Sequence, residues 1–526
     1  MIWLRLGRSG IALLLGAILT GLVFSALSPT PSARAAGTTR YVTVDGVDDT
    51  DCSNPGLPCR TPQYAIAEAG AGDVVKIAAG TYDSVSLIAF TTTVPYSFTQ
   101  IAYISKTLTV SGGYTVANWV TADVIANPTV FDAGGAGRGV TIFGTGTEVV
   151  TLTGLTLTGG DYTGLGNPNG VFLRNCRGYQ SDCGGGVYAV RVQLQASDLV
   201  VTGNIASRTR GSSPGGGLAL EDTLAGSTLT RLTVSGNVAL GSLSYGGGIA
   251  LDSVGAITIS ETLIDGNSAA GQGGAIAVFS PDGPITILNT DLTRNAAGAE
   301  APALYFETSE AGSLHLAQSQ VLTQASPAGD VIGIVNYGGD DEIVFRNVLI
   351  AGTTVTATTP DRGLIRTNVE SANGSLVRVV VVHATAAGNE GLALLDVQAV
   401  PFLSNFGRFD AGLTNTLAVD LPALFHTEQG GSSQVSIASD HTLTESVPAL
   451  TTGSIGTAAI TLTQTVSGQA NLGPTDRPER PSAAIDAALE LGIMVDASRG
   501  PRSGPADIGA LEAEPLPNVY LPALLK

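Results

Sequence analysis

Residues 232–249 read LTVSGNVALGSLSYGGGI, and this stretch contains the features that decide the fold. A short apolar strand ends in Asn237, a loop follows, and a glycine cluster opens the next apolar strand. The same order of features occurs four times between residues 199 and 304. The asparagines of the four copies are Asn204, Asn237, Asn267 and Asn295, which are 33, 30 and 28 residues apart. Repeats of this length are typical of solenoids, in which each repeat stacks on the next.

The region around these repeats is built from short strands. No helix of more than a few turns is evident between residues 101 and 475, and residues 151–158 alternate leucine with threonine. This alternation predicts strands whose leucines face the core and whose threonines face solvent. Strands of successive coils would then pair through backbone hydrogen bonds. We therefore expect an all-β fold, a single-stranded parallel β-helix.

The repeated asparagines have a structural interpretation and a functional one. A row of amides could bind a ligand. An asparagine at an equivalent turn of each coil can instead bond its own backbone and the asparagine of the next coil. We favour the second interpretation, a structural ladder formed by Asn204, Asn237, Asn267 and Asn295.

The N-terminal end of the solenoid carries a candidate lid. Thr61 and Pro62 open a short helix, with Thr as the cap and Pro in the first turn. An open solenoid end exposes apolar side chains and unpaired strand edges, which this helix can cover. The expected divisions of the chain are a signal peptide (1–35), an N-terminal cap with the first coils (36–100), the parallel β-helix (101–475), a C-terminal module (476–514) and an extended apolar tail (515–526).

The first residues have the order of a secretory signal peptide. Arg5 and Arg8 precede an apolar run from Ile11 to Phe24, and small residues around Ala35 follow. The run is too short for a membrane span, which needs ~20 apolar residues, and no later segment qualifies. We expect an exported protein, secreted or attached to the cell surface, with no transmembrane span in the mature chain.

The charge of the chain limits its partners. Without residues 1–35 the chain has 22 basic and 44 acidic side chains, a net charge of −22. Such a surface repels nucleic acid and anionic lipid, so neither is expected as a partner. The acidity favours solubility outside the cell, and attraction of divalent cations is the alternative.

The four cysteines form two local pairs, Cys52 with Cys59 and Cys176 with Cys183, and each pair encloses six residues. In an exported chain this spacing predicts two short-loop disulfides, because zinc ligands typically come as C-x2-C pairs. The disulfides would fix loops and take no part in chemistry.

Three parts of the sequence resemble known families. The repeat, with strand starts such as Gly247-Gly248-Ile249, resembles that of bacterial right-handed parallel β-helix proteins, including the polymorphic outer-membrane adhesin type. The segment from Tyr41 to Tyr82 resembles the opening of the same superfamily, whose fold is that of pectin lyases. Near the end, the motif residues Asp486, Arg499, Asp507, Gly509 and Glu512 stand in a segment similar to the choice-of-anchor Q domain. This resemblance implies a bacterial, exported protein and does not imply a reaction.

Two acidic runs are candidate calcium sites. Asp340, Asp341 and Glu342 form one run, and Asp45, Asp48, Asp49 and Asp51 form the other. Calcium prefers several carboxylate and carbonyl oxygens at once. Neither run matches an EF-hand loop or a calcium-binding nonapeptide repeat, so we interpret both as solvated turns. Calcium is the one candidate cofactor.

Residues with catalytic potential have simpler explanations. Asn289-Thr290-Asp291 matches a tripeptide of polygalacturonases, but the Gly-His-Gly and Arg-Ile-Lys elements that complete that site are absent. The four histidines, His315, His383, His426 and His441, stand in no sequence pattern that suggests a catalytic triad. Candidate sugar-stacking aromatics are Tyr103, Tyr114, Trp119, Tyr162, Tyr179 and Tyr188.

The sequence therefore favours a non-catalytic, monomeric surface or secreted protein that serves adhesion or glycan binding, with an extracellular glycan or protein as its partner. The alternative is a polysaccharide lyase or glycoside hydrolase on the same scaffold. An enzyme would place at least two carboxylates, or an acid and an Arg or Lys, on adjacent coils that line one groove.

Overall fold

The computed structural model describes residues 37–90, 96–166, 181–209, 213–241, 244–326, 330–355, 363–370, 376–382, 384–387, 393–399, 408–419, 423–429, 434–440, 442–445, 447, 449–454 and 459–463. All of them except Gly37 belong to the unit Thr38–Lys526. The expected signal peptide (1–35), the C-terminal module (476–514) and the tail (515–526) lie outside the described residues.

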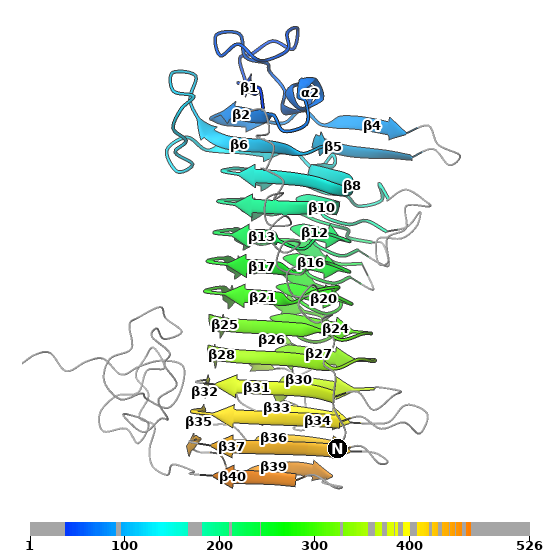
Figure 1. Cartoon of the computed structure of the whole chain (residues 1–526), viewed down its shortest axis with the longest axis vertical. Helices are drawn as coiled ribbons and strands as arrows, with labels where there is room; N and C mark the ends of the chain where they lie inside the picture. The colour runs from blue at the N-terminus through cyan, green and yellow to red at the C-terminus, as the bar shows by residue number, and fades with distance from the viewer. Residues whose placement is uncertain are drawn as a thin grey trace, which may run out of the picture. The chain divides into compact units, whose positions relative to one another are not determined.

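One regular coil illustrates how the chain winds. It consists of β16 (Ile249–Asp252), β17 (Ile257–Ser260), β18 (Leu263–Asp265) and the two-residue β19 (Ser268–Ala269). The next coil begins at β20 (Ile276–Phe279), which pairs with β16 in parallel and in register. Strands of successive coils lie above one another (Figure 1). The expected fold class, a parallel β-helix with a short capping helix, is confirmed.

The coils give four stacks of parallel strands. The first stack is β5 (Tyr96–Ile104), β8 (Arg138–Thr153), β10 (Val187–Ser197), β12 (Leu218–Glu221), β16, β20, β24 (Leu304–Thr308), β27 (Ile332–Asn336), β30 (Gly363–Val369), β33 (Ala393–Ala399), β36 (Ala423–Gln429) and β39 (Ala449–Ser454). The second is β1 (Thr39–Val42), β2 (Val74–Ala78), β6 (Leu108–Tyr114), β8, β10, β13 (Ser227–Thr230), β17, β21 (Ile285–Leu288), β25 (Ser313–Leu322), β28 (Asp341–Ala351), β31 (Leu376–Val382), β34 (Arg408–Thr414), β37 (Gln434–Asp440) and β40 (Ala459–Thr463). The third is β3 (Gly80–Tyr82), β7 (Thr129–Asp132), β9 (Thr156–Thr158), β11 (Val200–Thr202), β14 (Thr233–Ser235), β18, β22 (Asp291–Thr293), the ends of β25 and β28, β32 (Thr385–Ala387), β35 (Leu417–Val419) and β38 (Leu443–Glu445). The fourth, a separate sheet, is β15 (Val238–Ala239), β19, β23 (Ala296–Ala297), β26 (Ala325–Ser326) and β29 (Thr354–Val355).

The core is a column of aliphatic side chains inside the coils. Equivalent inward positions of the first stack hold Val187, Leu218, Ile249, Ile276 and Leu304, all fully buried. In residues 151–158 the leucines are likewise buried and the threonines are half-buried, as the alternation predicts. Each buried aliphatic side chain of this size contributes roughly 1.5–3 kcal/mol relative to an exposed one. Stacking therefore extends one continuous core with every coil.

The four asparagines form a hydrogen-bonded ladder inside the coils. Asn267 Nδ2 donates to Val234 O (2.9 Å) and to Asn295 Oδ1 (3.0 Å), and Asn267 Oδ1 accepts from the backbone N (3.0 Å) and Nδ2 (2.9 Å) of Asn237. Asn204 and Asn237 repeat the pattern. All four are buried, so each amide satisfies polar groups that would otherwise be orphaned. Gln324, which the sequence repeat does not show, continues the ladder by accepting from the backbone N of Asn295 (3.2 Å).

Several bends of each coil need left-handed backbone, and two of them illustrate this. At the start of the first strand, Gly215, Gly246 and Gly273 have φ between 61° and 71°, and the decayed fourth copy places Ala301 there with φ 54°. The bend between the second and third strands uses residues such as Asp198 and Arg231, both with φ 55°. Their side chains pair between coils, with Arg231 Nε 2.7 Å from Asp198 Oδ1. The second kind of bend lacks a glycine signal in the sequence.

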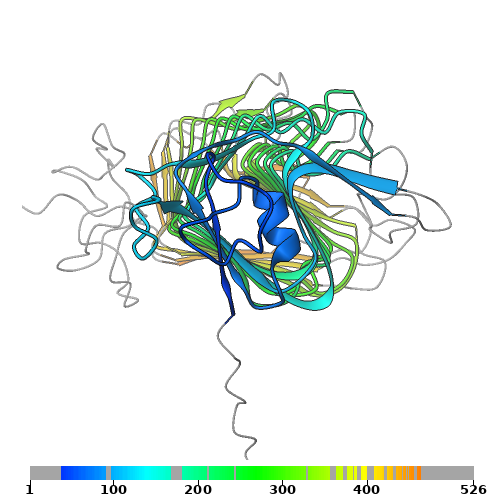
Figure 2. The ribbon, with the colours of Figure 1, turned by 90° about the horizontal axis from the view of Figure 1, so that it is seen from above.

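The N-terminal lid forms as the sequence predicts. Helix α2 (Pro62–Glu68) has Pro62 in its first turn, and the Thr61 hydroxyl accepts from the backbone N of Tyr64 at 3.3 Å. Seen along the stack, α2 lies across the end of the coils (Figure 2). Lys106 Nζ donates to Ile66 O (3.0 Å) in the last turn, where a positive charge complements the helix dipole. One departure from the parallel pattern is β4 (Ser86–Phe90), which pairs with β5 in antiparallel fashion.

The ladder generates a stability prediction. Replacing Asn267 with alanine leaves Val234 O and the backbone N of Asn237 buried without their partners. We expect Asn267→Ala to lower the free energy of unfolding by about 2–4 kcal/mol, because each orphaned buried polar group costs roughly 1–3 kcal/mol. Chemical denaturation checks this, with Thr258→Ala on the outward face of the same coil as the control. A loss no larger than that of the control would contradict a structural role for the ladder.

Candidate functional site

The outward face of the first stack changes character at the coil that contains β24. In earlier coils one outward position holds Ala219, Ala250 and Ala277 in succession. In the next coils the same register continues with Tyr305, Gly333, Arg366 and Asp396. Two residues further along each strand, the register runs through Phe279, Glu307, Val335, Asn368 and Gln398. At the first of these positions alanines therefore give way to an aromatic residue and then to charged ones, whereas the second position already carries Glu221 and Asp252 in earlier coils.

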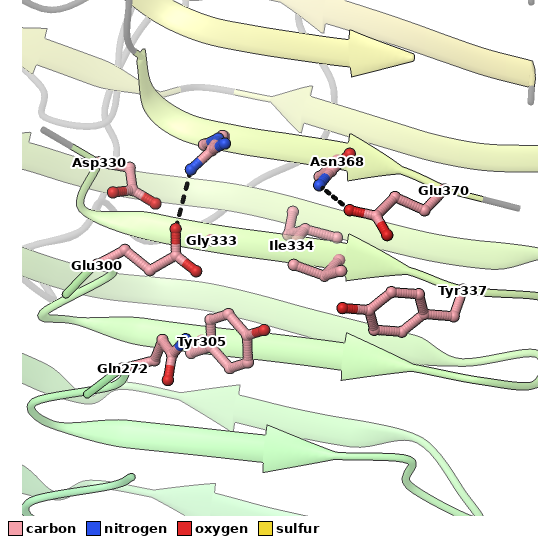
Figure 3. Close-up of a pocket in the computed structure, with 11 residues that line it drawn as sticks. Gln272, Glu300, Tyr305, Asp330, Gly333, Ile334, Tyr337, Asn368 and Glu370 are labelled. Atoms are coloured by element: carbon pink, nitrogen blue, oxygen red, sulfur yellow. Dashed lines mark hydrogen bonds and ion pairs between the residues drawn. The ribbon is translucent and has the colours of Figure 1, made fainter. Parts of the chain in front are cut away.

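A cavity of about 190 Å³ lies on this face. Its lining residues are Gln272, Glu300, Tyr305, Asp330, Gly333, Ile334, Val335, Tyr337, Arg366, Asn368 and Glu370. Gln272, Glu300 and Asp330 precede the first strands of three successive coils, whereas Tyr337 and Glu370 follow β27 and β30. Figure 3 shows Glu300 and Asp330 on one side, Tyr337 and Glu370 on the other, and Tyr305 between them. We call this site the Gly333 cavity.

The cavity exists because Gly333 has no side chain to fill it. Gly333 lies between Tyr305 and Arg366 in the stacked register. A Cβ added at Gly333 would lie 3.1 Å from Ala301 Cβ, 3.3 Å from Asp330 Oδ2 and 3.4 Å from Tyr305 Cδ2. Even one methyl group would therefore crowd the walls of the cavity.

Arg366 is held by groups from neighbouring coils. Its Nη1 donates to Glu300 Oε2 (2.9 Å), its Nη2 donates to Gln398 Oε1 (2.8 Å), and its Nε lies 4.0 Å from Asp396 Oδ2. The Arg366 side chain is 17% exposed, so the guanidinium is fixed at the wall rather than extended into solvent. A guanidinium held in this way can present its remaining N–H edge to a ligand without a large loss of rotamer entropy.

The surroundings of Glu307 raise the pKa of its carboxyl. Burial raises its pKa above the usual range, and the negative charges of Glu300 and Glu370 raise it further, against the opposing effect of a hydrogen bond from Tyr305. The Tyr305 hydroxyl donates to Glu307 Oε2 at 2.8 Å. Glu370 Oε1 accepts from Asn368 Nδ2 at 2.6 Å. Glu307 does not line the cavity but lies beside it, bonded to the lining residue Tyr305, so carboxyls in and next to the cavity differ in environment, which is a feature of acid–base centres.

Aromatic rings continue the site toward the preceding coils. The rings of Tyr245 and Phe279 lie 4.7 Å apart between centroids, and those of Phe279 and Tyr305 lie 5.6 Å apart. Tyr337, 47% exposed, stands at the opposite rim. These are not the aromatics that the sequence suggested for sugar stacking. Tyr114, Tyr162 and Tyr188 are buried, Tyr103 and Trp119 are half-buried, and Tyr179 lies outside the described residues.

The acidic run at Asp340 does not gather into a metal site. Asp341 is buried and accepts from Thr308 Oγ1 (2.7 Å), Asn336 Nδ2 (2.8 Å) and the backbone N of Gly312 (2.9 Å). Asp340 accepts from the backbone N of Leu376 at 2.8 Å, and Glu342 is exposed. Successive strand residues point to opposite faces, so these carboxylates diverge. Within the described ranges, no group of three or more His, Cys, Asp or Glu side chains could hold a metal ion.

The acidic run near the first cysteine pair is also used locally. Asp48 Oδ1 accepts from the backbone N of Arg60 (2.7 Å) and Asp51 Oδ1 accepts from Ser53 (2.8 Å). The predicted Cys52–Cys59 disulfide is confirmed, with an S–S distance of 2.02 Å. Cys183 is disulfide-bonded, and its predicted partner Cys176 lies outside the described residues.

The remaining predicted residues do not meet at the Gly333 cavity. His315 is on β25 in the second stack, where it lies 3.3 Å from the Ser313 hydroxyl. Asp291 begins β22, and Thr290 is buried, so the polygalacturonase-like tripeptide forms a strand-to-strand turn. His383 and His441, the side chain of His426, and the anchor-motif residues Asp486, Arg499, Asp507, Gly509 and Glu512 lie outside the described part of the chain.

The sequence contains a signal for the cavity that the repeat analysis missed. The residue before the left-handed turn changes from Pro214 to Tyr245, Gln272 and Glu300 along the stack. The outward strand position changes from alanine to Tyr305 in the coil that contains Glu300. Both changes require the coils to be aligned beyond Asn295, where the glycine cluster is replaced by Ala301 and its neighbours.

Comparisons with known proteins found similar solved structures but no family. No protein-family model matches the chain, and no curated protein matches it. Among solved structures, pectate lyase Pel9A is 12% identical with a TM-score of 0.41, over 90% of this chain and 96% of that one. The Agl-KA catalytic domain is 12% identical with a TM-score of 0.31, over 74% of this chain and 63% of that one. At this identity and these TM-scores, neither likeness indicates what this chain binds or does.

The described part of the chain contains no helix with the length and apolar character needed to span a bilayer.

Asp341 generates a prediction about pH. Burial raises the pKa of its carboxyl to about 6, despite the hydrogen bonds from Asn336 and Thr308 that favour the charged form. Because the folded pKa lies above the unfolded one, the folded state binds the proton more tightly and stability falls as pH rises from about 4 to 6. Asp341→Asn cannot ionise, so its free energy of unfolding relative to the natural chain should improve by up to about 3 kcal/mol between pH 4 and pH 7. Denaturation of both proteins at the two pH values checks this; a difference independent of pH would contradict it.

Proposed function

We propose that this protein is an exported β-helix protein that binds a glycan, and that the Gly333 cavity holds one sugar unit of it. The observation that carries the proposal is the convergence of aromatic, amide and carboxylate side chains from successive coils on a cavity left open by Gly333. Export and attachment to a cell surface are proposed from the sequence of residues 1–35 and the net negative charge.

The lining has the chemistry that a sugar unit requires. A sugar ring presents hydroxyls that both donate and accept hydrogen bonds, together with apolar C–H faces. Gln272, Asn368 and Glu370 provide amide and carboxylate partners for hydroxyls, and Tyr305 and Tyr337 provide rings for the C–H faces. The volume of about 190 Å³ is below the roughly 300–1,000 Å³ of sites that enclose drug-sized ligands, so a single unit of a longer chain fits better than a whole oligosaccharide.

A polyuronate lyase is the less favoured enzyme. Such an enzyme needs a basic residue that can take a proton beside a neutralised substrate carboxylate. Arg366 is the one basic side chain that lines the cavity, and it is engaged by Glu300 and Gln398. The carboxylates of Glu300, Asp330 and Glu370 would repel a uronate ligand.

A glycoside hydrolase is the second candidate, favoured by the perturbed carboxyl of Glu307. Glycoside hydrolysis needs a protonated carboxyl that donates to the glycosidic oxygen and an ionised one that activates water or attacks the sugar. The raised pKa of Glu307 suits the donor, and Glu300 or Glu370, which raise that pKa, suit the ionised partner. In this mechanism water supplies the hydroxyl of the new reducing end and restores the proton to Glu307.

Filling the cavity tests the binding site. We expect Gly333→Ala to weaken binding about tenfold, since the added methyl group crowds Tyr305 and Asp330. Calorimetric titration with oligomers of glucose, N-acetylglucosamine and galacturonate measures the effect, and Tyr337→Ala, at the rim, gives a second variant that spares the strand. Gly412→Ala is the matched control, because a Cβ at Gly412 meets nothing within 4 Å. Binding unchanged in folded Gly333→Ala and Tyr337→Ala, or no binding of any oligomer to the natural chain, would refute the proposed site.

Catalysis is tested separately from binding. If the protein hydrolyses a bound oligomer, Glu307→Gln should lower the rate of release of reducing ends by at least ~100-fold, the typical contribution of a general acid. The rate should fall as pH rises through the raised pKa of Glu307, because only the protonated carboxyl can donate. Glu310→Gln, an exposed residue outside the cavity, is the control. Oligomers that bind without releasing reducing ends would exclude the hydrolase and leave the binding function standing.

A further inference from the structure

We propose that the sugar unit bound in the Gly333 cavity carries a positively charged amino group, so that the ligand is a glycan with free amino sugars. The inference rests on the proposed glycan-binding function and specifies its ligand class. Three features support this inference: the negative charge of the lining, the tyrosine rings in the walls, and the hydrogen bonds that already engage Arg366.

The lining has an excess of negative charge. Glu300, Asp330 and Glu370 contribute three carboxylates from three successive coils, and Arg366 is the single basic residue among them. Asp396, fully buried, lies on the neighbouring strand beside Arg366. A ligand that enters this site exchanges water for carboxylates, so an ammonium group gains an attraction that a neutral hydroxyl does not.

The cation within the site is directed away from Glu370. Arg366 bonds Glu300 and Gln398 on one side of the cavity, whereas Glu370 bonds the neutral amide of Asn368 on the other side. Figure 3 shows Glu370 and Tyr337 on the side opposite Glu300. Among the described residues no ion pair engages Glu370, so the half of the cavity near Glu370 is where a ligand ammonium group would meet a carboxylate that Arg366 does not neutralise.

The aromatic residues suit the same ligand. The face of a tyrosine ring attracts a cation within about 6 Å of its centroid, and Tyr305 and Tyr337 both line the cavity. The negative field of the cavity is also felt by Tyr337, whose pKa is raised by burial and by Glu307, Glu370 and Glu300. Carboxylates together with tyrosine rings select a cation over a neutral group, and the ring-sized hollow above Gly333 selects a sugar over a bare amine.

The test compares ligands that differ in one group. A tetramer of glucosamine, its fully N-acetylated form and a tetramer of glucose are titrated into the full chain by calorimetry at a pH where the amine is charged. We expect the glucosamine tetramer to bind at least about tenfold more tightly than the other two, and the preference to shrink with added salt, because partly exposed charge pairs are screened. Spermidine, an amine without a sugar ring, should bind more weakly than the glucosamine tetramer.

Variants locate the effect. Glu370→Gln keeps the size of the side chain and removes its charge, so it should weaken binding of the glucosamine tetramer about fivefold more than it weakens binding of the glucose tetramer. Glu310→Gln, outside the cavity, is the matched control and should leave the preference unchanged.

The outcomes separate this inference from the function on which it rests. Equal binding of the glucosamine and glucose tetramers would overturn the amino-sugar inference and leave glycan binding intact. Spermidine or a lysine-rich peptide that binds as tightly as the glucosamine tetramer would overturn it in favour of a general cation site. Binding of no oligosaccharide would overturn both proposals.

Discussion

The structure depends on backbone hydrogen bonds between successive coils, which satisfy strand edges that would otherwise be open. These bonds repeat in register over most of the described chain, as between β12, β16 and β20. The asparagine ladder does the same for the turns, where a buried peptide group has no strand partner. Because every coil is completed by its neighbours, the fold needs only inward aliphatic residues, a ladder amide and a lid such as α2 at the end.

The same register makes a surface site possible without any change of fold. Outward positions of stacked strands form rows, so exchanging alanine for Tyr305, Gly333 and Arg366 in three coils builds a cavity while the inward row stays aliphatic. Strands hold these side chains more rigidly than loops would. The fold and the site are therefore encoded by alternate residues of the same strands.

The sequence was sufficient for the architecture and insufficient for the site. The Asn237-type repeat and the leucine alternation report local geometry, which is why the β-helix, α2 and the Cys52–Cys59 disulfide could be predicted. The Gly333 cavity depends on residues 28 to 66 positions apart, such as Glu300 and Arg366, that meet only when the coils are aligned. The repeat is weakest there, where Ala301 stands in the place of a turn glycine. Sequence reasoning therefore turned to Asp340 and the buried tyrosines, which side-chain direction keeps apart.

The acidic residues in and beside the cavity lower the stability of the fold. Glu300, Glu307 and Glu370 repel one another closely enough to raise the pKa of Glu307, so in the free protein they oppose the stability of the stack. The inter-coil bonds of β24, β27 and β30 hold the strands in place regardless. The fold itself does not require charged residues here. Earlier coils have the alanines Ala219, Ala250 and Ala277 at the equivalent outward position and adopt the same fold. Carboxylates kept together at such a cost, around a hollow and beside two tyrosine rings, are better explained by a ligand than by packing.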